Sequence, residues 1–548
     1  MKYITAAWTV LIIMGITACG GRKGRPRQQE IVQDPRQLNE VVAAQVAERL
    51  EYIAGNEGLM EDSVPALRLS ALRLAYGQQG GAALWSDNGR SHKAVFSMLD
   101  WIRNADNYGL PAKRYHSTAL ESARRQLEAS RKDAALWAKM DLLLTDAFMK
   151  MASDLHYGNA PNDRITLRTD SLFSDTLLNT FLQQALQAGD VSAVLQQQEP
   201  AHPGYIALKE GVQLYKAQYG GKHWDTLPQI YTDTLQFRRQ LAIRLMAGGH
   251  YDTTGIPATD TVPLKNAVKA FQREFNIYPD GIAGKRTIQT LNKQPEDWLL
   301  QAALNMDRWR KFPDSLPERY LLVNIPAFRL NVMEHDTMML ESRVIVGAPR
   351  TRTPVLNSVM TNFVLYPYWR VPYSIVFKEM LPQIKNNIHY LAEKNLEVVD
   401  HKGNVVNPDT INWGRLSKKY FPYVLRQMDG LDNSLGIMKF NFMNKYSVYL
   451  HDTNNRSLFS NSNRALSHGC VRVQQWDSLA MYMVRADPRP AIRDSVRTWL
   501  DTEQQKQYTM HKRLPIYIRY FTAELRNGKM QFYEDVYGED RALMQYFH

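Results

Sequence analysis

The spacing of apolar residues divides the chain into a helical part and a later part made of strands. Over residues 38–195 apolar side chains recur three and four positions apart, as in Val42, Val46 and Leu50, which is the pattern of amphipathic helices. From residue 320 the period changes to two, as in residues 320–325, which is typical of half-buried strands. The pattern therefore predicts a multidomain α+β protein, with helices first and a mainly-β domain later.

Shorter patterns lie between and within these parts. Residues 237–295 predict a compact helical unit around a turn at Asp280-Gly281, and residues 296–317 predict a connecting helix that Pro313 ends. Residues 374–433 interrupt the strand pattern with helical and charged stretches, and a segment of this length is more typical of a lid than of a plain loop. An insertion without a role in catalysis remains the alternative.

Both ends of the chain carry signals of their own. Met1-Lys2 and the apolar run that follows have the layout of a secretory signal, and its ending, Ile16-Thr17-Ala18-Cys19, resembles a lipobox that leaves Cys19 lipid-modified. An ordinary signal peptide, with an incidental cysteine, is the alternative. Residues 20–37 predict a flexible basic linker. Residues 485–548 predict an extension with a hairpin around Asn527-Gly528 that packs on one of the larger domains.

Length and charge narrow the classes of partner. A chain of 548 residues is too long for one core, so three or four domains are expected. A net charge of +12 suits anionic partners such as nucleic acid, phospholipid surfaces or wall polymers. The chain has no zinc-finger spacing and no RNA-binding aromatic signature, so nucleic acid is not expected. No His/Asp cluster has metal-ligand spacing, and neither a metal nor a cofactor is expected.

The candidate chemistry lies in two short stretches of the β part. The sequence has two cysteines, and with Cys19 capped by lipid Cys470 has no disulfide partner. Tyr449-Leu450-His451 and Val471-Arg472-Val473 alternate like two strand ends, which predicts that His451 and Cys470 lie on neighbouring strands. A thiolate is the reactive form of cysteine, and an imidazole nearby can take its proton. A buried, inert cysteine is the alternative.

Residues next to Cys470 fit the same interpretation. Gly469 permits a tight turn that aims main-chain N–H groups at a developing oxyanion, and Arg472 supplies a cation suited to a substrate carboxylate. His468 is a competing base, ranked second because side chains so close along a strand or tight turn need not meet. The orienting partner of His451 stays open between Asp452 and a main-chain carbonyl.

The run Ser467-His468-Gly469-Cys470-Val471-Arg472-Val473, after His451-Asp452-Thr453, resembles the signature of the L,D-transpeptidases, which cross-link peptidoglycan through a cysteine. The order of segments is similar to that of the large, lidded members from Gram-negative envelopes. The resemblance implies a helical scaffold domain over 38–236, a small three-helix peptidoglycan-binding module over 237–295, and a mainly-β catalytic domain over 318–484 with a helical lid over about 374–433.

The same resemblance implies roles for individual residues. Cys470 would be the nucleophile and His451 its base, in an enzyme that joins third-position residues of stem peptides through a thioester. His468, Gly469 and Ser467 would shape the oxyanion pocket, and Arg472, Tyr449 and Trp369 would contact substrate. Carbapenems are expected to acylate Cys470.

The expected setting is wall biogenesis and cell shape. The protein would contact peptidoglycan stem peptides and glycan, and would be tethered to the membrane by the lipid on Cys19. A periplasm-facing lipoprotein is expected, with the outer membrane favoured because Gly20 and Gly21 follow the lipobox. Two alternatives remain: an L,D-carboxypeptidase or endopeptidase that hydrolyses stems, and a non-catalytic, lipid-anchored wall-binding protein. Whether the module still binds glycan also stays open.

Overall fold

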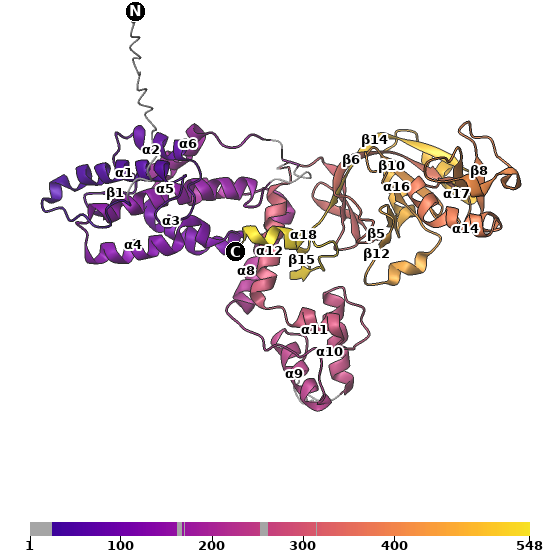
Figure 1. Ribbon diagram of the computed structural model, residues 1–548, viewed down its shortest axis with the longest axis horizontal. Coiled ribbons are helices and arrows are strands. Elements are labelled where there is room, and N and C mark those ends of the chain that lie inside the picture. Colours follow the sequence, from indigo (N-terminus) through magenta and orange to yellow (C-terminus); the bar gives the residue numbers. More distant parts are fainter. Residues whose placement is uncertain (1–24, 162–166, 169, 253–260, 314, 548) are drawn as a thin grey trace, which may run out of the picture. The chain divides into compact units, whose positions relative to one another are not determined.

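The computed structural model describes residues 25–547 except 162–166, 169, 253–260 and 314. The predicted leader and the lipidation site at Cys19 lie outside these residues. The described chain forms two compact units, and Figure 1 shows the first as a group of helices. Within the described residues, no helix has both the length and the apolar character needed to span a bilayer.

The first unit comprises the described residues up to Asp106, with Leu110–Tyr157 and Asp170–Glu199. Its central helix is α5 (Ala134–Tyr157), which is buried along nearly its whole length. The surrounding elements are α1 (Leu38–Gly55), α2 (Leu69–Gly77), β1 (Ser86–Asp87), β2 (Arg90–Ser91), α3 (Ala94–Arg103), α4 (Ser117–Ala129), α6 (Asp175–Ala188) and α7 (Ser192–Gln196). The predicted helical domain is confirmed.

The buried polar side chains of α5 have hydrogen-bond or ion-pair partners. The Asp146 carboxylate lies 2.8 Å from His116 Nε2 and 2.8 Å from Lys150 Nζ, and all three side chains are almost fully buried. Asp141 accepts a 2.8 Å hydrogen bond from the Tyr76 hydroxyl. Because a buried charge without a partner costs several kcal/mol, these contacts are what allow a polar stripe inside the core helix.

Residues 25–37 differ from the predicted flexible linker. Val32 is buried, its N–H donates to Lys132 O at 2.9 Å, and Ile31 forms a bridge with Asp133. The segment therefore packs along the helical unit through the buried Val32 and main-chain contacts, which its basic composition did not indicate. Residues 20–24 lie outside the described part.

The second unit comprises Asn107–Gly109, the described residues of 158–169 and those from Pro200 onward. It therefore contains α8 (Pro203–Tyr219), which the sequence assigned to the first helical domain. Its buried residues Tyr205, Leu208 and Val212 pack in one cluster with Trp298 and Met306 of α12 (Pro295–Arg310). The apolar face of α8 is thus used within the second unit. Periodicity predicts such a face, but it does not say which neighbour covers it.

A three-helix module follows, as predicted. It consists of α9 (Thr234–Ala247), α10 (Thr261–Glu274) and α11 (Lys285–Leu291), with Phe237, Val268 and Ile288 in its own core. The turn between α10 and α11 is held by Gln272, which donates to Asp280 Oδ1 and accepts from Gly281 N–H, both at 2.8 Å.

The β domain contains a nine-stranded sheet in the order β12-β5-β13-β11-β10-β6-β14-β3-β4. Strand β5 pairs with β4 as well as with β12 and β13, so the sheet curls on itself around one apolar core. The strands are β3 (Arg319–Asn324), β4 (Arg329–Glu334), β5 (Thr337–Gly347), β6 (Leu356–Leu365), β10 (Met438–Phe442), β11 (Leu450–His451), β12 (Ala465–Ser467), β13 (Val471–Val473) and β14 (Lys506–Arg519), and the helices α16 (Trp476–Val484) and α17 (Ile492–Asp501) precede β14.

The sheet extends past residue 484, where the sequence placed the end of this domain. Strand β14 lies between β3 and β6, parallel to the first and antiparallel to the second, with Ile516 and Ile518 fully buried. The C-terminal segment is therefore part of the sheet. Its hairpin turns at Asn527-Gly528 as predicted, but the paired strands are β15 (Ala523–Arg526) and β16 (Lys529–Phe532).

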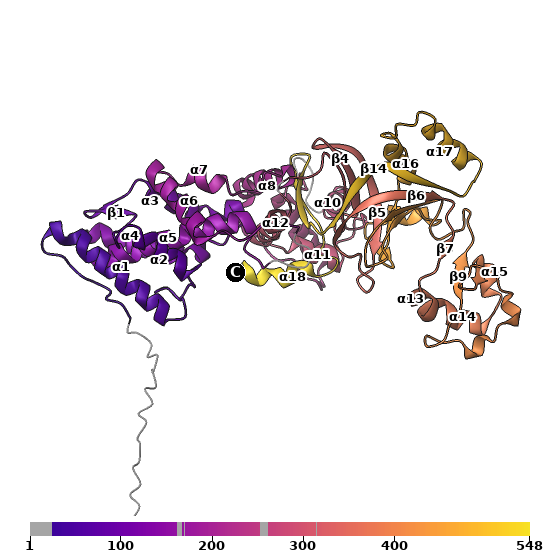
Figure 2. The same ribbon diagram turned by 90° about the horizontal axis from the view of Figure 1, so that it is seen from above.

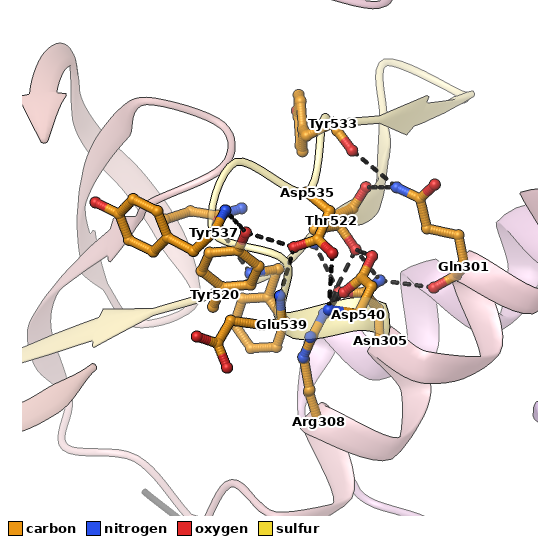
Figure 3. Close-up of polar contacts among 12 residues, drawn as sticks. Gln301, Asn305, Arg308, Tyr520, Thr522, Tyr533, Asp535, Tyr537, Glu539 and Asp540 are labelled. Carbon is orange, nitrogen blue, oxygen red and sulfur yellow. Dashed lines mark hydrogen bonds and ion pairs between the residues drawn. The ribbon is translucent and has the colours of Figure 1, made fainter. Parts of the chain in front are cut away.

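A buried polar network ties the C-terminal segment to helix α12 (Figure 3). Asn305 and Thr522 exchange hydrogen bonds, and Gln301 donates to the carbonyl oxygens of Thr522 and Tyr533. Arg308 lies 2.6 Å from Asp540, at the start of α18 (Glu539–Leu543). Because every partner is nearly enclosed, this network fixes the segment after β14 in one register.

The predicted lid is a small subdomain with its own apolar core and its own sheet, in the order β7-β9-β8 (Figure 2). Its strands are β7 (Trp369–Arg370), β8 (Leu396–Val399) and β9 (Val424–Gln427), and its helical elements are α13 (Tyr373–Ile375), a π-helical turn at Val376–Met380, α14 (Leu381–Asn386) and α15 (Tyr390–Glu393). The strands within it were not predicted.

Candidate active site

A cavity of about 1110 Å³ lies between the sheet and the lid subdomain. Its wall contains all the candidate site residues that the sequence predicted except Gly469 and Cys19: Trp369, Tyr449, His451, Ser467, His468, Cys470 and Arg472. Gly469 is buried just behind the wall. The lid therefore forms one side of the space into which Cys470 opens.

Strand pairing explains why these side chains meet. β11 and β13 are parallel neighbours, with Leu450 opposite Val471 and His451 opposite Arg472. Since side chains alternate along a strand, Cys470 lies on the same face as Arg472, and Tyr449 on the same face as His451. The prediction of two adjacent strand ends is confirmed, and the loop between them turns through Arg456–Ser460.

The turn before Cys470 is built around Gly469, whose φ of +121° is in a region that residues with a side chain rarely adopt. The Ser467 hydroxyl accepts from Gly469 N–H at 3.1 Å and donates to Cys470 O at 2.5 Å. Among the described residues the Cys470 N–H has no hydrogen-bond partner. It is therefore free to donate to an oxyanion that forms next to the sulfur.

Cys470 is partly exposed, and its Sγ lies 4.0 Å from the carbonyl oxygen of Ser447. Burial raises the pKa of its thiol above the ordinary value, while hydrogen bonds from Tyr449 and the positive charges of Lys439 and Arg472 act in the opposite direction. The thiol is therefore protonated at neutral pH in the resting structure.

His451 is almost fully buried, at 4% exposure. Burial and the nearby charge of Arg472 lower the pKa of its imidazole to about 3, against the opposing effect of main-chain hydrogen bonds at Asp452 and Leu435. Its Nδ1 atom is buried and has no hydrogen-bond partner among the described residues. The ring is thus neutral and has a free nitrogen that can accept a proton.

The Asp452 carboxylate is engaged elsewhere. Its Oδ2 accepts from Ile437 N–H at 3.0 Å and lies 2.8 Å from Arg456 Nη2. Of the two orienting groups that the sequence left open, the Asp452 carboxylate thus bonds Ile437 and Arg456, while main-chain groups at Asp452 and Leu435 raise the imidazole pKa.

His468, the competing base, contacts the lid. Its Nε2 lies 2.8 Å from Glu379 Oε1 in the π-helical turn, and both side chains are half exposed. The ring is therefore held by a carboxylate of the lid subdomain.

Lys439 belongs to the site but was not predicted. It lies opposite His451 in the pairing of β10 with β11, and its Nζ is 4.3 Å from the centre of the Tyr449 ring. Burial lowers its pKa. The signal was present in the sequence, because Lys439 alternates with the buried Met438 and Phe440 and so must project from the other face of β10. Glu379 was also missed.

Arg472 in the wall of the cavity and Lys439 close to the thiol make the site cationic. Arg472 Nε is buried without a hydrogen-bond partner among the described residues, and Nη1 lies 3.4 Å from Thr453 Oγ1. A buried guanidinium nitrogen without a partner is costly, and a carboxylate ligand would satisfy it. Among the described residues, no group of three or more His, Cys, Asp or Glu side chains is placed to hold a metal.

Three stretches of the chain match models of known families. Residues 70–211 match the model of a scaffold domain, residues 236–291 that of a "Putative peptidoglycan binding domain", and residues 318–485 that of the L,D-transpeptidase catalytic domain.

A protein of Haemophilus influenzae named "Putative L,D-transpeptidase" is 34% identical over 293 residues, which cover 53% of this chain and 58% of that relative. The chain thus aligns with less than two thirds of the relative's length.

Two solved structures are also similar. An L,D-transpeptidase from Stackebrandtia nassauensis is 15% identical and covers 56% of this chain and 98% of its own, with a TM-score of 0.21. One from Xylanimonas cellulosilytica is 14% identical and covers 55% and 98%, with a TM-score of 0.16. Scores this low carry no weight for the fold. On the sequence matches and the site geometry, the chain is a multidomain protein whose catalytic domain, residues 318–485, belongs to the L,D-transpeptidase family.

Proposed function

We propose that the protein joins third-position residues of two peptidoglycan stem peptides through a thioester on Cys470. The observation that carries this proposal is that a partly exposed thiol and a buried, neutral imidazole lie in the wall of one cavity, with Arg472 in the same wall and the charge of Lys439 acting on the thiol. The match of residues 318–485 to a transpeptidase domain supports the reaction class.

In the first half-reaction the Cys470 sulfur attacks the carbonyl carbon of the peptide bond that joins the third residue of the donor stem to its terminal D-alanine. The thiol proton passes to His451 as the carbon–sulfur bond forms, and the Cys470 N–H donates to the oxyanion. The carbon–nitrogen bond then breaks, and His451 gives the proton to the departing terminal D-alanine. The product is a thioester between the donor stem and Cys470.

In the second half-reaction the side-chain amine of a neighbouring stem attacks the thioester. His451 takes a proton from that amine, the new carbon–nitrogen bond forms, and the carbon–sulfur bond breaks. The proton returns to the sulfur. The energy of the cleaved peptide bond is kept in the thioester, so the exchange needs no nucleotide.

The charge of the site fits this substrate. Stem peptides carry free carboxylates, and Lys439 and Arg472 place two cations beside the thiol. The match of residues 236–291 to a peptidoglycan-binding domain supports a substrate held on the same polymer. We also propose that Cys19 carries a lipid and that the enzyme faces the periplasm, with the outer membrane favoured.

Two other activities use the same chain differently. A hydrolase would let water resolve the thioester, and a wall-binding protein would not need the thiol. Full-length protein incubated with disaccharide tetrapeptides should yield a cross-linked dimer by mass spectrometry, and Cys470→Ala should yield none. If the wild type yielded only shortened monomers, the protein would be a hydrolase. If neither the wild type nor Cys470→Ala yielded any product, the binding role would be indicated. A carbapenem adduct on the Cys470 peptide tests the nucleophile directly.

A further inference from the structure

We propose that Tyr537, in the C-terminal segment after the hairpin, is a positioning residue. It orients the Gly469–Cys470 peptide unit, in the turn that precedes the sulfur, so that the Cys470 N–H can donate to an oxyanion. The inference rests on the proposed thiol chemistry at Cys470, and it assigns a role to a segment outside the matched catalytic domain. It is carried by an unbroken series of buried hydrogen bonds from Tyr537 to Gly469.

The first link is Thr353, which follows β5 and is 2% exposed. Its hydroxyl donates to the carbonyl oxygen of Gly469 at 2.8 Å and accepts from Gly347 N–H at 2.8 Å. Because the Gly469–Cys470 peptide unit carries both that carbonyl and the Cys470 N–H, the bond to Thr353 fixes the direction in which the N–H points.

The second link is Tyr537 itself. Its hydroxyl donates to Gly347 O at 2.6 Å and accepts from Thr353 N–H at 3.2 Å. One phenol thereby closes the turn that begins at Gly347 and returns to Thr353. Both capacities of the hydroxyl are used, and no water is needed to complete the geometry.

The turn from Gly347 to Thr353 is tightly packed. A Cβ on Gly347 would lie 2.1 Å from Thr351 O and 2.6 Å from Thr353 N, so the two arms of the turn already touch. Loss of the phenol would leave a buried carbonyl and a buried N–H unpaired, which favours a shift of the turn toward other partners.

Tyr537 is itself held from the other side. Its N–H donates to the Tyr520 hydroxyl at 2.8 Å, and that hydroxyl donates to Asp535 at 2.6 Å (Figure 3). Asp535 also accepts from the N–H groups of Glu539 and Asp540, and Asp540 pairs with Arg308 of α12. The position of Tyr537 is therefore set by the network that anchors the C-terminal segment.

The test compares two reactions of the same sulfur in full-length protein. Acylation by meropenem passes through an oxyanion and needs the Cys470 N–H, whereas alkylation by iodoacetamide forms no oxyanion. Removal of an oxyanion donor costs about 10²–10³ in rate, so a displaced donor should cost about tenfold. We expect Tyr537→Phe to slow meropenem acylation about tenfold and to leave alkylation within about twofold.

Variants at Thr353 and one control variant check the path. Thr353→Val should slow acylation as Tyr537→Phe does, the double variant should add little, and Thr353→Ser should recover most of the lost rate. Tyr366→Phe is the matched control, because its buried hydroxyl also donates to a main-chain carbonyl, Leu500 O at 2.9 Å, in the same domain. It should leave both reactions as they are in the wild type.

Each outcome decides the matter. Unchanged meropenem acylation in Tyr537→Phe would overturn this inference and leave the proposed function standing. An equal fall in acylation and alkylation would show that Tyr537 serves the general structure and would overturn the inference too. A wild-type protein that meropenem does not acylate would overturn the proposed function and this inference together.

Discussion

His468 Nε2 and Glu379 Oε1 lie 2.8 Å apart and join the turn that precedes Cys470 to the lid subdomain. Because both side chains are half exposed, such a pair contributes only ~0–1 kcal/mol. We expect His468→Ala and Glu379→Gln each to reduce meropenem acylation of Cys470 by less than about tenfold, a loss of this size corresponding to 1.4 kcal/mol. His451→Ala, which removes the base, should reduce it ~10²–10⁴-fold. Stopped-flow or mass-spectrometric acylation rates compare them, and a larger loss in His468→Ala than in His451→Ala would exchange their roles.

The protonation of Cys470 and His451 predicts an unusual pH profile. The thiol pKa is raised by burial and the imidazole pKa is lowered to about 3, so both groups are neutral between these values and no thiolate–imidazolium pair forms at rest. Alkylation by iodoacetamide should therefore rise with pH throughout the neutral range. A rate that is flat from acid to neutral pH would show a preformed ion pair and contradict this prediction.

The positive charges near the sulfur affect the pH dependence of alkylation. Lys439 and Arg472 both lower the thiol pKa, so removing either charge should raise it. We expect the alkylation profiles of Lys439→Met and Arg472→Gln to move to higher pH relative to the wild type. Arg493→Gln, on the exposed side of α17, is the control for a lost positive charge and should leave the profile unchanged.

The unpartnered Nε of Arg472 predicts a role in binding. A charge-assisted hydrogen bond to a carboxylate is worth about 1.5–3 kcal/mol, so Arg472→Gln should raise KM for a stem peptide by about tenfold or more. An amidated stem should bind the wild type and the variant nearly equally, since it lacks the carboxylate in both cases. If Arg472→Gln weakened both substrates by the same factor, the guanidinium would serve the fold and not the substrate.

The proximity of the strands next to His451 and Cys470 was predictable because these residues are close along the chain. Alternation around His451 and Cys470 placed both on neighbouring strand ends, and the pairing of β11 with β13 confirms it. Glu379 could not be found in this way, since it comes from the lid and its contact with His468 spans 89 positions. Lys439 could have been predicted, because it alternates with the apolar residues Met438 and Phe440 and therefore projects from the opposite face of β10, next to His451.

The domain boundaries show a similar limit. The sequence placed α8 within the expected helical domain over 38–236 and residues 485–548 in an extension, but the partner of each segment was a matter of tertiary packing. Residues 25–37 were expected to be a linker from their composition, yet a single buried valine and a few main-chain contacts suffice to dock them. Local patterns predict which faces are apolar, and they leave open what covers those faces.

The position of β14 predicts that the catalytic domain depends on residues beyond its matched range. Ile516 is fully buried where β14 contacts β3 on one side and β6 on the other. Ile516→Ala should lower the free energy of unfolding of the sheet by ~2–5 kcal/mol, because it removes buried methyl groups and leaves a cavity. Hydrogen exchange read on peptides from β3 and β6 measures this in the full chain, and both strands should lose protection together. Lys512→Ala, at an exposed position of the same strand, should change neither. If Ile516→Ala left the exchange of β3 and β6 unchanged, β14 would be a dispensable addition and the sheet would be complete without it.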